Sequence, residues 1–493
     1  MLCTGARILL ESLKREGVDL FFGYPGGAVI DIYDELSNHP DLRHILVRHE
    51  QGAVHAADGY ARACGKVGVC LATSGPGATN TVTGIATAYS DSIPMVIFTG
   101  QVSTPLIGND AFQEVDIIGI PRPCTKHNFL VKDVKDLAET VRKAFYLARS
   151  GRPGPVLVDI PKNIQQASCE FVWPEDVVMR SYCPTFRANL NQLRRAMDVL
   201  VTSRKPLIVA GGGVIMANAA EELCTLAHLM HAPVCSTLMG LGAFPGDDPL
   251  WIGMLGMHGT FAANRAVTQA DVILAVGARF DDRVTGKLSQ FAPNARIVHI
   301  DIDRAEIDKN VQTDHHIVGD AKQVLRLLLE RVPQYEHKAW KDYVFSFPTE
   351  TGYTETPSSL TPKQVLSTIV RRFPQDSIVA TDVGQHQMWS IQHLHFDYPG
   401  QLLTSGGFGA MGFGLGAAIG AKRGNPDKTV IHITGDGCFR MNGNELATEE
   451  FYKLPVITFI FNNGNLGMVR QWQNLTCDKR FSETALNRGP DFV

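Results

Sequence analysis

Two oxygen-bearing side chains follow neighbouring strand-like segments near the carboxyl end of the sequence. Asp436 comes after the apolar, β-branched segment 429–433, and Asn463 comes after the apolar segment 456–461. The spacing of 27 residues (463 − 436) suits one strand–helix–strand crossover. Because the carboxyl ends of parallel strands meet at one edge of a sheet, we expect both side chains at that edge. Carboxylate and amide oxygens, with phosphate oxygens and water, are ligands that Mg²⁺ prefers.

The segment between these two residues predicts a turn followed by a helix. Gly435 and Gly437 flank Asp436 and are expected to form a tight turn that glycine follows most easily. A helix is expected over 444–452, with an asparagine at its N-cap. A Gly-Asp-Gly sequence alone is more often an ordinary turn, but the Asn-Asn pair after the next strand favours metal binding.

Alternating strand-like and helical segments on either side predict an α/β protein with three doubly wound parallel-sheet domains. We expect these domains at 1–168, 190–335 and 362–493, joined by Pro-rich linkers at 169–189 and 336–362.

The composition is ordinary for a globular enzyme, with 44% hydrophobic and 19% charged residues and a net charge of −4. The chain has no Lys/Arg-rich block, so neither nucleic acid nor an anionic membrane is an expected partner. No apolar run approaches the roughly 18 residues that span a bilayer. The N-terminus predicts an amphipathic helix with Thr4 as its N-cap, rather than a signal peptide. The ten cysteines form no CxxC pair. We therefore expect a reducing, cytoplasmic setting.

Taken together, Gly-Asp-Gly and Asn-Asn at this spacing resemble the cofactor fingerprint of thiamin-diphosphate (ThDP) enzymes. RHEQGAVHAADGYARA (48–63) and NNGNLGMVRQW (462–472) are similar to the large catalytic subunit of acetohydroxyacid synthase, also called acetolactate synthase. The resemblance covers essentially the whole chain and implies ThDP, Mg²⁺ and FAD as cofactors. The three domains would then be a pyrimidine-binding, a central FAD-binding and a pyrophosphate-binding domain.

The resemblance also implies roles for residues of the first and third domains. Glu50 would hydrogen-bond the aminopyrimidine ring of ThDP, although a strand-end glutamate is usually solvated. Asp436, Asn463 and Asn465 would hold Mg²⁺. The other implied ThDP contacts are Gly384, Gln385, His386, Gly409, Met411, Gly435, Gly437 and Met468. For Met411, core packing is the simpler alternative.

Glycine-rich and polar segments of the central domain resemble a flavin site. The implied FAD contacts, which include one residue of the first domain, are Arg152, Gly211, Gly212, Gly213, Thr237, Leu238, Met239, Gly256, Met257, His258, Gly277, Arg279, Asp281, Arg283, Asp301, Ile302, Asp320 and Ala321. The Gly211–Gly213 run lacks the GxGxxG spacing, so by itself it is weak support for a nucleotide site.

The implied substrate site contains Gly27, Gln113, Lys162, Arg283 and Trp472. The alternatives are a surface ion pair of Arg283 with Asp281 or Asp282, and a core aromatic role for Trp472. The implied reaction is decarboxylation of pyruvate and carboligation to a second 2-ketoacid, pyruvate or 2-ketobutyrate, in branched-chain amino-acid biosynthesis. A pyruvate oxidase, a glyoxylate carboligase or a catalytically inactive ThDP/FAD-binding partner subunit are the alternatives.

Relatives assemble such a site between subunits, so the resemblance implies a homodimer or homotetramer, with a regulatory small subunit as a possible partner. Relatives also continue for several tens of residues beyond the position of Val493, and we therefore expect the third domain to be incomplete at its carboxyl end.

Overall fold

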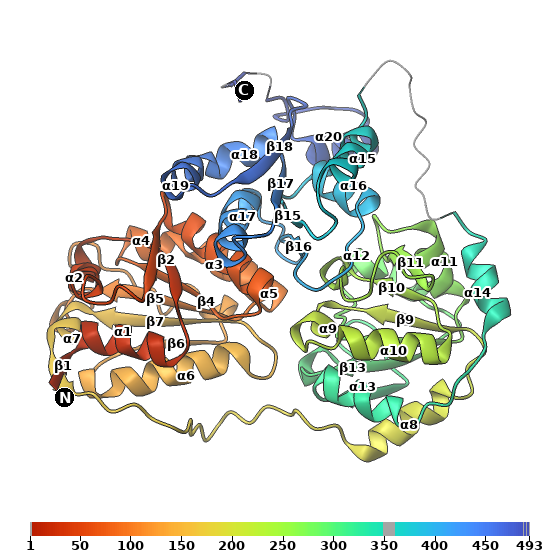
Figure 1. The fold of residues 1–493 in the computed structure, drawn as a ribbon, viewed down its shortest axis with the longest axis horizontal. Coiled ribbons are helices and arrows are strands. Elements are labelled where there is room, and N and C mark those ends of the chain that lie inside the picture. Colours follow the sequence, from red (N-terminus) through yellow and green to blue (C-terminus); the bar gives the residue numbers. More distant parts are fainter. Residues whose placement is uncertain (1, 349–359, 487, 490, 493) are drawn as a thin grey trace. The chain divides into compact units, whose positions relative to one another are not determined.

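The computed structural model describes residues 2–348, 360–486, 488–489 and 491–492. The chain divides into two compact units (Figure 1). The first unit combines Met1–Cys183, Ser377–His386 and Leu403–Val493, and the second combines Pro184–Asp376 with Gln387–Leu402. The predicted first and third domains thus belong mainly to one unit, and the predicted central domain belongs to the other.

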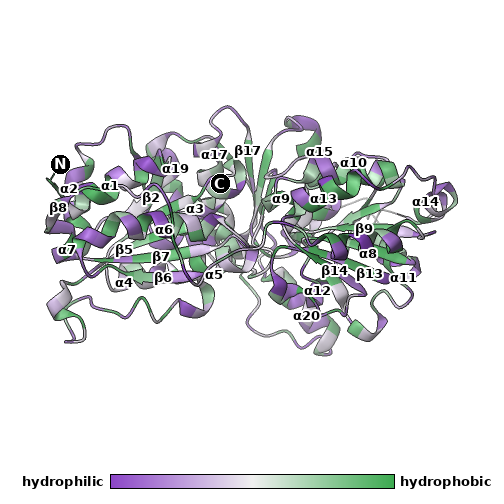
Figure 2. Cartoon of the chain, turned by 90° about the horizontal axis from the view of Figure 1, so that it is seen from below, coloured by the Kyte–Doolittle hydropathy of each residue, from purple (hydrophilic) through white to green (hydrophobic). Residues whose placement is uncertain are grey.

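The amino-terminal part of the first unit is built on a parallel sheet. Within its described residues the strand order is β3–β2–β4–β5–β7–β6, and all neighbours pair in parallel. These strands are β2 (Leu20–Tyr24), β3 (Arg43–Leu46), β4 (Gly68–Ala72), β5 (Met95–Gln101), β6 (His127–Leu130) and β7 (Pro155–Pro161). β5 and β7 are buried along their whole length and are largely green in Figure 2, as a doubly covered sheet requires.

Helices and a short antiparallel pair of strands complete this part. The helices are α1 (Gly5–Arg15), α2 (Ile30–Leu36), α3 (Glu50–Cys64), α4 (Pro76–Asn80), α5 (Val82–Asp91), α6 (Leu137–Arg149) and α7 (Lys162–Gln166). As predicted, Thr4 caps α1, its side chain accepting a hydrogen bond from the Arg7 backbone N–H. β1 (Leu2–Thr4) pairs antiparallel with β8 (Ser168–Glu170), which ties the end of the region back to its start.

The carboxyl-terminal part of the first unit contains a second sheet, of described strand order β16–β15–β17–β18. The strands are β15 (Ile378–Thr381), β16 (Leu402–Leu403), β17 (Val430–Gly435) and β18 (Val456–Phe461). β17 lies between β15 and β18 and pairs in parallel with both. The helices are α17 (Phe413–Gly424), α18 (Asp436–Asn442), α19 (Leu446–Tyr452) and α20 (Gly467–Thr476), and α16 (Gln385–His393) begins in this unit and continues in the second.

Small residues bring α3 and α17 into backbone contact. A Cβ on Gly59 of α3 would overlap the backbone of Ala417, and a Cβ on Gly420 of α17 would overlap the carbonyl of Ala56. The alanines and glycines of the two sequences therefore serve this close packing between the two sheets of the unit.

The second unit is built on a parallel sheet of described strand order β11–β10–β9–β12–β13–β14. The strands are β9 (Pro206–Ala210), β10 (Val234–Ser236), β11 (Trp251–Met254), β12 (Val272–Val276), β13 (Arg296–Asp301) and β14 (His315–Val318). Alternate residues of β9 enter different hydrophobic clusters, Ile208 and Ala210 in one and Leu207 and Val209 in the other. Both faces of the sheet are therefore covered, and the predicted α/β fold class is confirmed.

The helices of this unit are α8 (Leu190–Leu200), α9 (Gly212–Met216), α10 (Ala220–Met230), α11 (Phe261–Gln269), α12 (Asp282–Thr285), α13 (Ala321–Leu329), α14 (Lys338–Phe345) and α15 (Pro362–Arg372). None of the helices in the described ranges combines the length and the apolar character that crossing a bilayer requires.

The predicted turn around Asp436 is wrong. Gly435 ends β17 with φ −103°, and α18 begins at Asp436 itself without a positive φ at either glycine. Glycine is required there for space: a Cβ on Gly435 would lie 2.9 Å from His386 Nδ1, and one on Gly437 would lie 2.9 Å from Leu466 Cδ2. The predicted helix over 444–452 is observed as α19, preceded by a separate turn of 3₁₀ helix at Gly443–Glu445.

The predicted linkers differ in outcome. Residues 171–189 contain neither helix nor strand, as expected. The second linker is wrong at its start, because Lys338–Phe345 forms α14, whose Trp340 is buried and donates from Nε1 to the Pro206 carbonyl at 2.8 Å. Most of the remainder, 349–359, lies outside the described residues.

Candidate functional site

The candidate cofactor edge consists of the carboxyl ends of β15, β17 and β18. Gly435 of β17 is paired with Phe461 of β18, so Asp436 and Asn463 leave the sheet from matching positions. β15 flanks the other side of β17 in the same direction. The two oxygen-bearing residues therefore start from one sheet edge, as a strand–helix–strand crossover requires.

Asp436 supplies a buried carboxyl group at this edge, with one oxygen that lacks a hydrogen-bond partner. The residue is 1% exposed, and no described group donates a hydrogen bond to its Oδ2 atom. A buried carboxylate oxygen destabilises the fold unless a cation or a donor compensates it. At the neighbouring strand end, Asn463 is exposed and its Oδ1 accepts a hydrogen bond from the Asn465 backbone N–H at 3.0 Å. This donor set fits a hard cation such as Mg²⁺.

Gly384, Gln385 and His386 lie at the third strand end, between β15 and the first turn of α16. Burial lowers the pKa of His386 to about 4, so its imidazole is neutral at pH 7. Gln385 donates from Nε2 to Oε1 of Gln471 in α20 at 2.8 Å. The segment that follows β15 thus contacts the helix that follows Asn463.

A buried network that the sequence reasoning did not identify lies beneath this edge. Asp382 accepts hydrogen bonds from the Gly414 backbone N–H at 2.9 Å and from the Thr434 hydroxyl at 2.7 Å. Its Oδ2 also lies 3.0 Å from Nε2 of His432. Burial alone would raise the pKa of Asp382, but these hydrogen bonds and the charge of His432 lower it to about 2. The only sequence signal is an aspartate directly after a buried strand.

The glycine-rich segment before α17 carries two of the predicted ThDP contacts. Gly409 and Gly412 both have positive φ, 72° and 86°, so the chain bends sharply on either side of Met411. A Cβ on Gly437 would lie 3.7 Å from Met411 Cε, which places the methionine end beside the start of α18. Met468 is half-buried in the first turn of α20.

Glu50 is the first residue of α3 and is only 8% exposed, so it is not a solvated strand-end glutamate. Its Oε2 accepts a hydrogen bond from Asn80 Nδ2 at 3.0 Å. A Cβ on Gly77 would lie 3.1 Å from its Oε1, so the absence of a side chain at Gly77 leaves room for the carboxylate. Asn80 and Gly77 are further neighbours of Glu50 to which the sequence analysis assigned no role.

Two residues of the predicted substrate site touch each other: Lys162 Nζ donates to the Gly27 carbonyl at 3.1 Å. Gln113 has φ +59°, and a Cβ on Gly75 would lie 2.7 Å from its carbonyl oxygen. Gln113 is therefore held against the turn that leads into α4. Its neighbour Phe112 is 88% exposed.

Three further predicted residues are Trp472, Arg152 and Arg283. Trp472 is 41% exposed on α20, so a core aromatic role is wrong. Arg152 Nε donates to the Ser92 hydroxyl at 2.9 Å. Arg283 belongs to the second unit, where its largely exposed guanidinium lies 3.5 Å from the Asp282 carboxylate.

A second candidate site occupies the carboxyl edge of the sheet in the second unit. Counted from β9, the strand order is 3-2-1-4-5-6, the order of dinucleotide-binding folds. The order reverses between β9 and β12, and ligands of such sheets bind at this switch point. Gly211 follows β9 directly, and Gly277 follows β12 directly.

Bare backbone lines the switch point. The Gly211 N–H donates to the Val276 carbonyl at 2.9 Å, and the Gly213 N–H donates to the Gly277 carbonyl at 3.0 Å. Gly277 has φ +59°, and a Cβ on Gly213 would lie 2.6 Å from its Cα atom. The three-glycine run therefore serves close approach of two strand ends, which explains glycine there without the GxGxxG spacing.

The other predicted flavin contacts follow the remaining strands of the same edge. Thr237, Leu238 and Met239 come after β10; Gly256, Met257 and His258 after β11; Arg279, Asp281 and Arg283 after β12; Asp301 and Ile302 at and after the end of β13; and Asp320 and Ala321 after β14. Asp281 and Asp320 cap α12 and α13. The Met257 N–H donates to the Arg283 carbonyl at 2.8 Å, which joins the β11 and β12 loops.

Comparison with known families gives three matches along the chain. Residues 3–120 match the N-terminal TPP binding domain of thiamine pyrophosphate enzymes, 193–328 match their central domain, and 382–493 match their C-terminal TPP binding domain.

Curated relatives are similar to nearly the whole chain. The acetolactate synthase large subunit of Buchnera aphidicola (from Schizaphis graminum) is 48% identical over 99% of this chain and 87% of its own length. The acetolactate synthase isozyme 3 large subunit of Escherichia coli K12 is 49% identical, with the same shares covered. A probable acetolactate synthase large subunit of Methanocaldococcus jannaschii is 50% identical over 99% of this chain and 85% of its own length.

Proposed function

This chain belongs to the acetolactate synthase large subunits, a family of thiamine pyrophosphate enzymes, and on that premise we propose how its residues carry out the reaction. The activity is the ThDP-dependent condensation of pyruvate with a second 2-ketoacid in branched-chain amino-acid biosynthesis. The observation that carries the proposal is the set of polar strand ends, Asp436 and Asn463 with Gly384–His386, at one edge of a parallel sheet.

Bound thiamine diphosphate supplies the carbon nucleophile of the reaction. Glu50 is proposed to hydrogen-bond the aminopyrimidine ring nitrogen of the cofactor and to hold a proton there. Its burial supports this role, because a buried carboxylate oxygen requires a hydrogen-bonding partner and water is largely excluded here. Asn80, which donates to Oε2, would leave Oε1 directed to the ring.

We propose Mg²⁺ as the cation that joins the diphosphate to the protein. Asp436 and Asn463 would bind it through side-chain oxygens, and Asn465 through its backbone. The unsatisfied Oδ2 of Asp436 supports this assignment. Gly384, Gln385 and His386 would contact the diphosphate, and the neutral His386 would act there as a hydrogen-bonding group rather than as a cation. Gly409, Met411, Gly435, Gly437 and Met468 would complete the cofactor pocket.

FAD is proposed for the switch point of the second unit. The strand order and the bare backbone at Gly211, Gly213 and Gly277 support a dinucleotide there, because its phosphates need close approach to the strand ends. Arg152 is proposed as a further flavin contact on the family resemblance alone. No step of the proposed reaction uses the flavin as an oxidant.

For the substrate site we propose Gly27, Gln113, Lys162, Arg283 and Trp472. The Lys162–Gly27 contact supports the first part of this set. The exposed guanidinium of Arg283 offers the planar fork that suits a 2-ketoacid carboxylate, and the exposed indole of Trp472 offers an apolar surface for the longer side chain of 2-ketobutyrate.

We further propose a homodimer or homotetramer in the cytoplasm, with domain boundaries at 1–168, 190–335 and 362–493. The relatives are named large subunits, which supports a small regulatory subunit as a partner. All ten cysteines carry free thiols, as in proteins of a reducing compartment.

The test is to incubate the purified protein with pyruvate, ThDP, Mg²⁺ and FAD, and to measure acetolactate together with flavin absorbance. We expect acetolactate while the flavin stays oxidised, and a rate at least about 100-fold lower in Glu50→Gln with ThDP binding retained. Flavin reduction by pyruvate would indicate an oxidase instead, and bound cofactors without CO₂ release would indicate an inactive partner subunit.

A further inference from the structure

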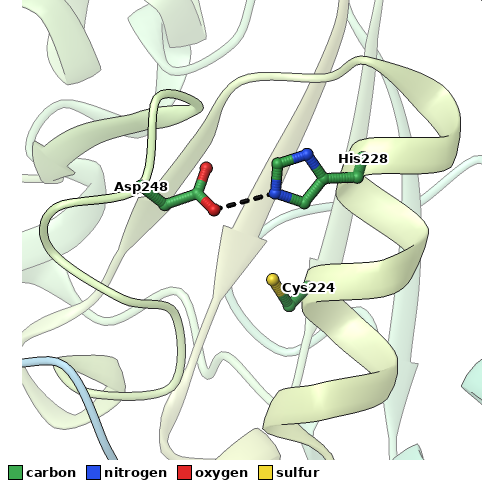
Figure 3. A group of neighbouring side chains, drawn as sticks. All are labelled: Cys224, His228 and Asp248. Atoms are coloured by element: carbon green, nitrogen blue, oxygen red, sulfur yellow. Dashed lines mark hydrogen bonds and ion pairs between the residues drawn. The ribbon is translucent and has the colours of Figure 1, made fainter.

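Three side chains of metal-binding type lie close together within the second unit, and none of them was assigned a role above. Cys224 and His228 lie one turn apart on α10, and Asp248 lies in the loop before β11 (Figure 3). Figure 3 shows the thiol, the imidazole and the carboxylate turned toward a common point between helix and loop. Spacing of i and i+4 places two ligands on the same helix face.

The loop carboxylate is held in place before any ligand binds. Asp248 accepts a hydrogen bond at Oδ1 from the Leu250 backbone N–H at 2.8 Å, and its carbonyl accepts one from the Trp251 N–H at 2.9 Å. Its side chain is only 12% exposed. The second oxygen, Oδ2, is left facing Nε2 of His228 at 2.8 Å. The carboxylate therefore needs little rearrangement to act as a ligand.

The spacing of the three ligand atoms fits a small tetrahedral cation. The thiol sulfur, an imidazole nitrogen and a carboxylate oxygen all lie within 4.8 Å of one another. Around Zn²⁺, with bonds of about 2.0–2.3 Å, such ligand atoms stand roughly 3.4–3.6 Å apart. The cation would replace the proton between His228 and Asp248, and both side chains would retreat by a few tenths of an ångström.

We propose that Cys224, His228 and Asp248 bind a divalent transition-metal ion of the Zn²⁺ type, with one coordination position left open. Mixed sulfur, nitrogen and oxygen ligands favour Zn²⁺ over Mg²⁺, which prefers oxygen alone.

The location gives the site a consequence for the sheet edge. β10, Thr237–Met239 and the loop to Asp248 together connect α10 to β11. A metal ion bound to both ends of this connection would restrain the segment that carries three of the proposed flavin contacts. Metal binding itself does not depend on the proposed function.

The test is titration of EDTA-treated, reduced protein with Co²⁺ and then Zn²⁺. We expect thiolate-to-cobalt charge-transfer absorption that saturates at one equivalent and is removed by Zn²⁺. In Cys224→Ser that absorption should disappear, and in Asp248→Asn the affinity should fall at least tenfold. Cys183→Ser, which removes an exposed thiol elsewhere, is the matched control and should bind as the parent chain does. Circular dichroism checks that each variant is folded.

The proposal is overturned if the parent chain gives no charge-transfer band. It is also overturned if the band survives in Cys224→Ser or disappears in Cys183→Ser. Equal affinity of Asp248→Asn and the parent chain would remove Asp248 from the ligand set and with it the site as proposed.

Discussion

The Oε1 atom of Glu445 accepts a hydrogen bond from the backbone N–H of His49 at 3.0 Å. The same carboxylate accepts the Arg48 N–H at 3.0 Å and the Thr448 hydroxyl at 2.6 Å, and a Cβ on Gly52 would overlap it. Glu445 follows Asp436 by nine residues (445 − 436). The buried carboxylate of Glu445 thus holds the start of α3, where Glu50 lies, and it comes from the segment that follows Asp436 at the candidate cofactor edge.

Glu445→Gln should disturb the position of Glu50. A glutamine amide cannot accept two backbone N–H groups and a hydroxyl together, and charge-assisted hydrogen bonds contribute about 1.5–3 kcal/mol each. We expect acetolactate formation to fall about tenfold, the equivalent of 1.4 kcal/mol in activation free energy, and the melting temperature to drop. Glu450→Gln, whose exposed carboxylate pairs with Lys453, should leave both unchanged. A parent-like rate and melting temperature in Glu445→Gln would refute the positioning role.

Asp436→Asn separates metal binding from folding. Removing the charged ligand should weaken Mg²⁺-dependent ThDP binding by about 10- to 100-fold, or roughly 1.4–2.8 kcal/mol. Without Mg²⁺ the variant should be at least as stable as the parent chain, because a buried carboxyl oxygen without a hydrogen-bond partner is gone. Calorimetric titration and thermal unfolding measure the two effects, with the exposed Asp427→Asn as control. A loss of stability in metal-free Asp436→Asn would contradict the cation-site assignment.

Gly435→Ala tests whether glycine at the end of β17 is needed for space. Its Cβ would lie 2.9 Å from Nδ1 of the buried His386, so the imidazole must shift, and we expect a loss of about 1–3 kcal/mol of unfolding free energy. In Gly443→Ala the nearest atom is a Phe439 ring carbon at 3.8 Å, and the change should stay within about 0.5 kcal/mol. Denaturant unfolding of both variants measures these losses. Equal losses of unfolding free energy in the two variants would show that the His386 side chain can shift at no cost.

Gly277→Ala should close the switch point of the second sheet. The new Cβ would overlap the Gly213 backbone, and φ is +59°. Gly286→Ala also places an alanine at a positive φ, +57°, but with nothing within 4 Å, so it shows the conformational cost of about 1–3 kcal/mol without a clash. We expect bound flavin, measured by absorbance after gel filtration, to be lost in Gly277→Ala and kept in Gly286→Ala. Retention of FAD by both variants would contradict a flavin site at the switch point.

Asp159 should make stability depend on pH. Burial raises its pKa from 3.8 to about 7, although Thr99 and Gln101 donate hydrogen bonds to it. The folded state therefore holds the proton more tightly than the unfolded state. The stabilisation is complete below about pH 4 and is lost as the pH rises through 7, on the order of 4 kcal/mol in total at 1.36 kcal/mol per pKa unit. Asp159→Asn should match the parent chain near pH 4 and exceed it in unfolding free energy at pH 8. The same difference at both pH values would refute a raised pKa.

The sequence by itself determined the types of the elements and their polar ends. Apolar β-branched segments predicted β17 and β18, because strand burial leaves a local pattern in the residues. The Thr4 cap of α1 and the exit of Asp436 and Asn463 from one edge also followed from local spacing. The motif resemblance also predicted the family, and similarity to relatives over 99% of the chain confirms it.

Only the tertiary structure decided which groups satisfy one another. Glu445 and His49 are 396 residues apart, and Asp382 and His432 are 50 apart, so no local period records either hydrogen bond. The sequence predicts a turn at Gly435, but glycine is found there because a side chain would clash with His386. His386 follows a different strand, so the local sequence does not show this clash. Likewise, the sequence predicts a linker where α14 forms. The helix is held by Trp340, which is buried and donates a hydrogen bond to the distant Pro206, and the residues around Trp340 in the sequence do not indicate this contact. Hydrogen bonds and steric clearance of this kind depend on distances that arise only when distant segments pack together.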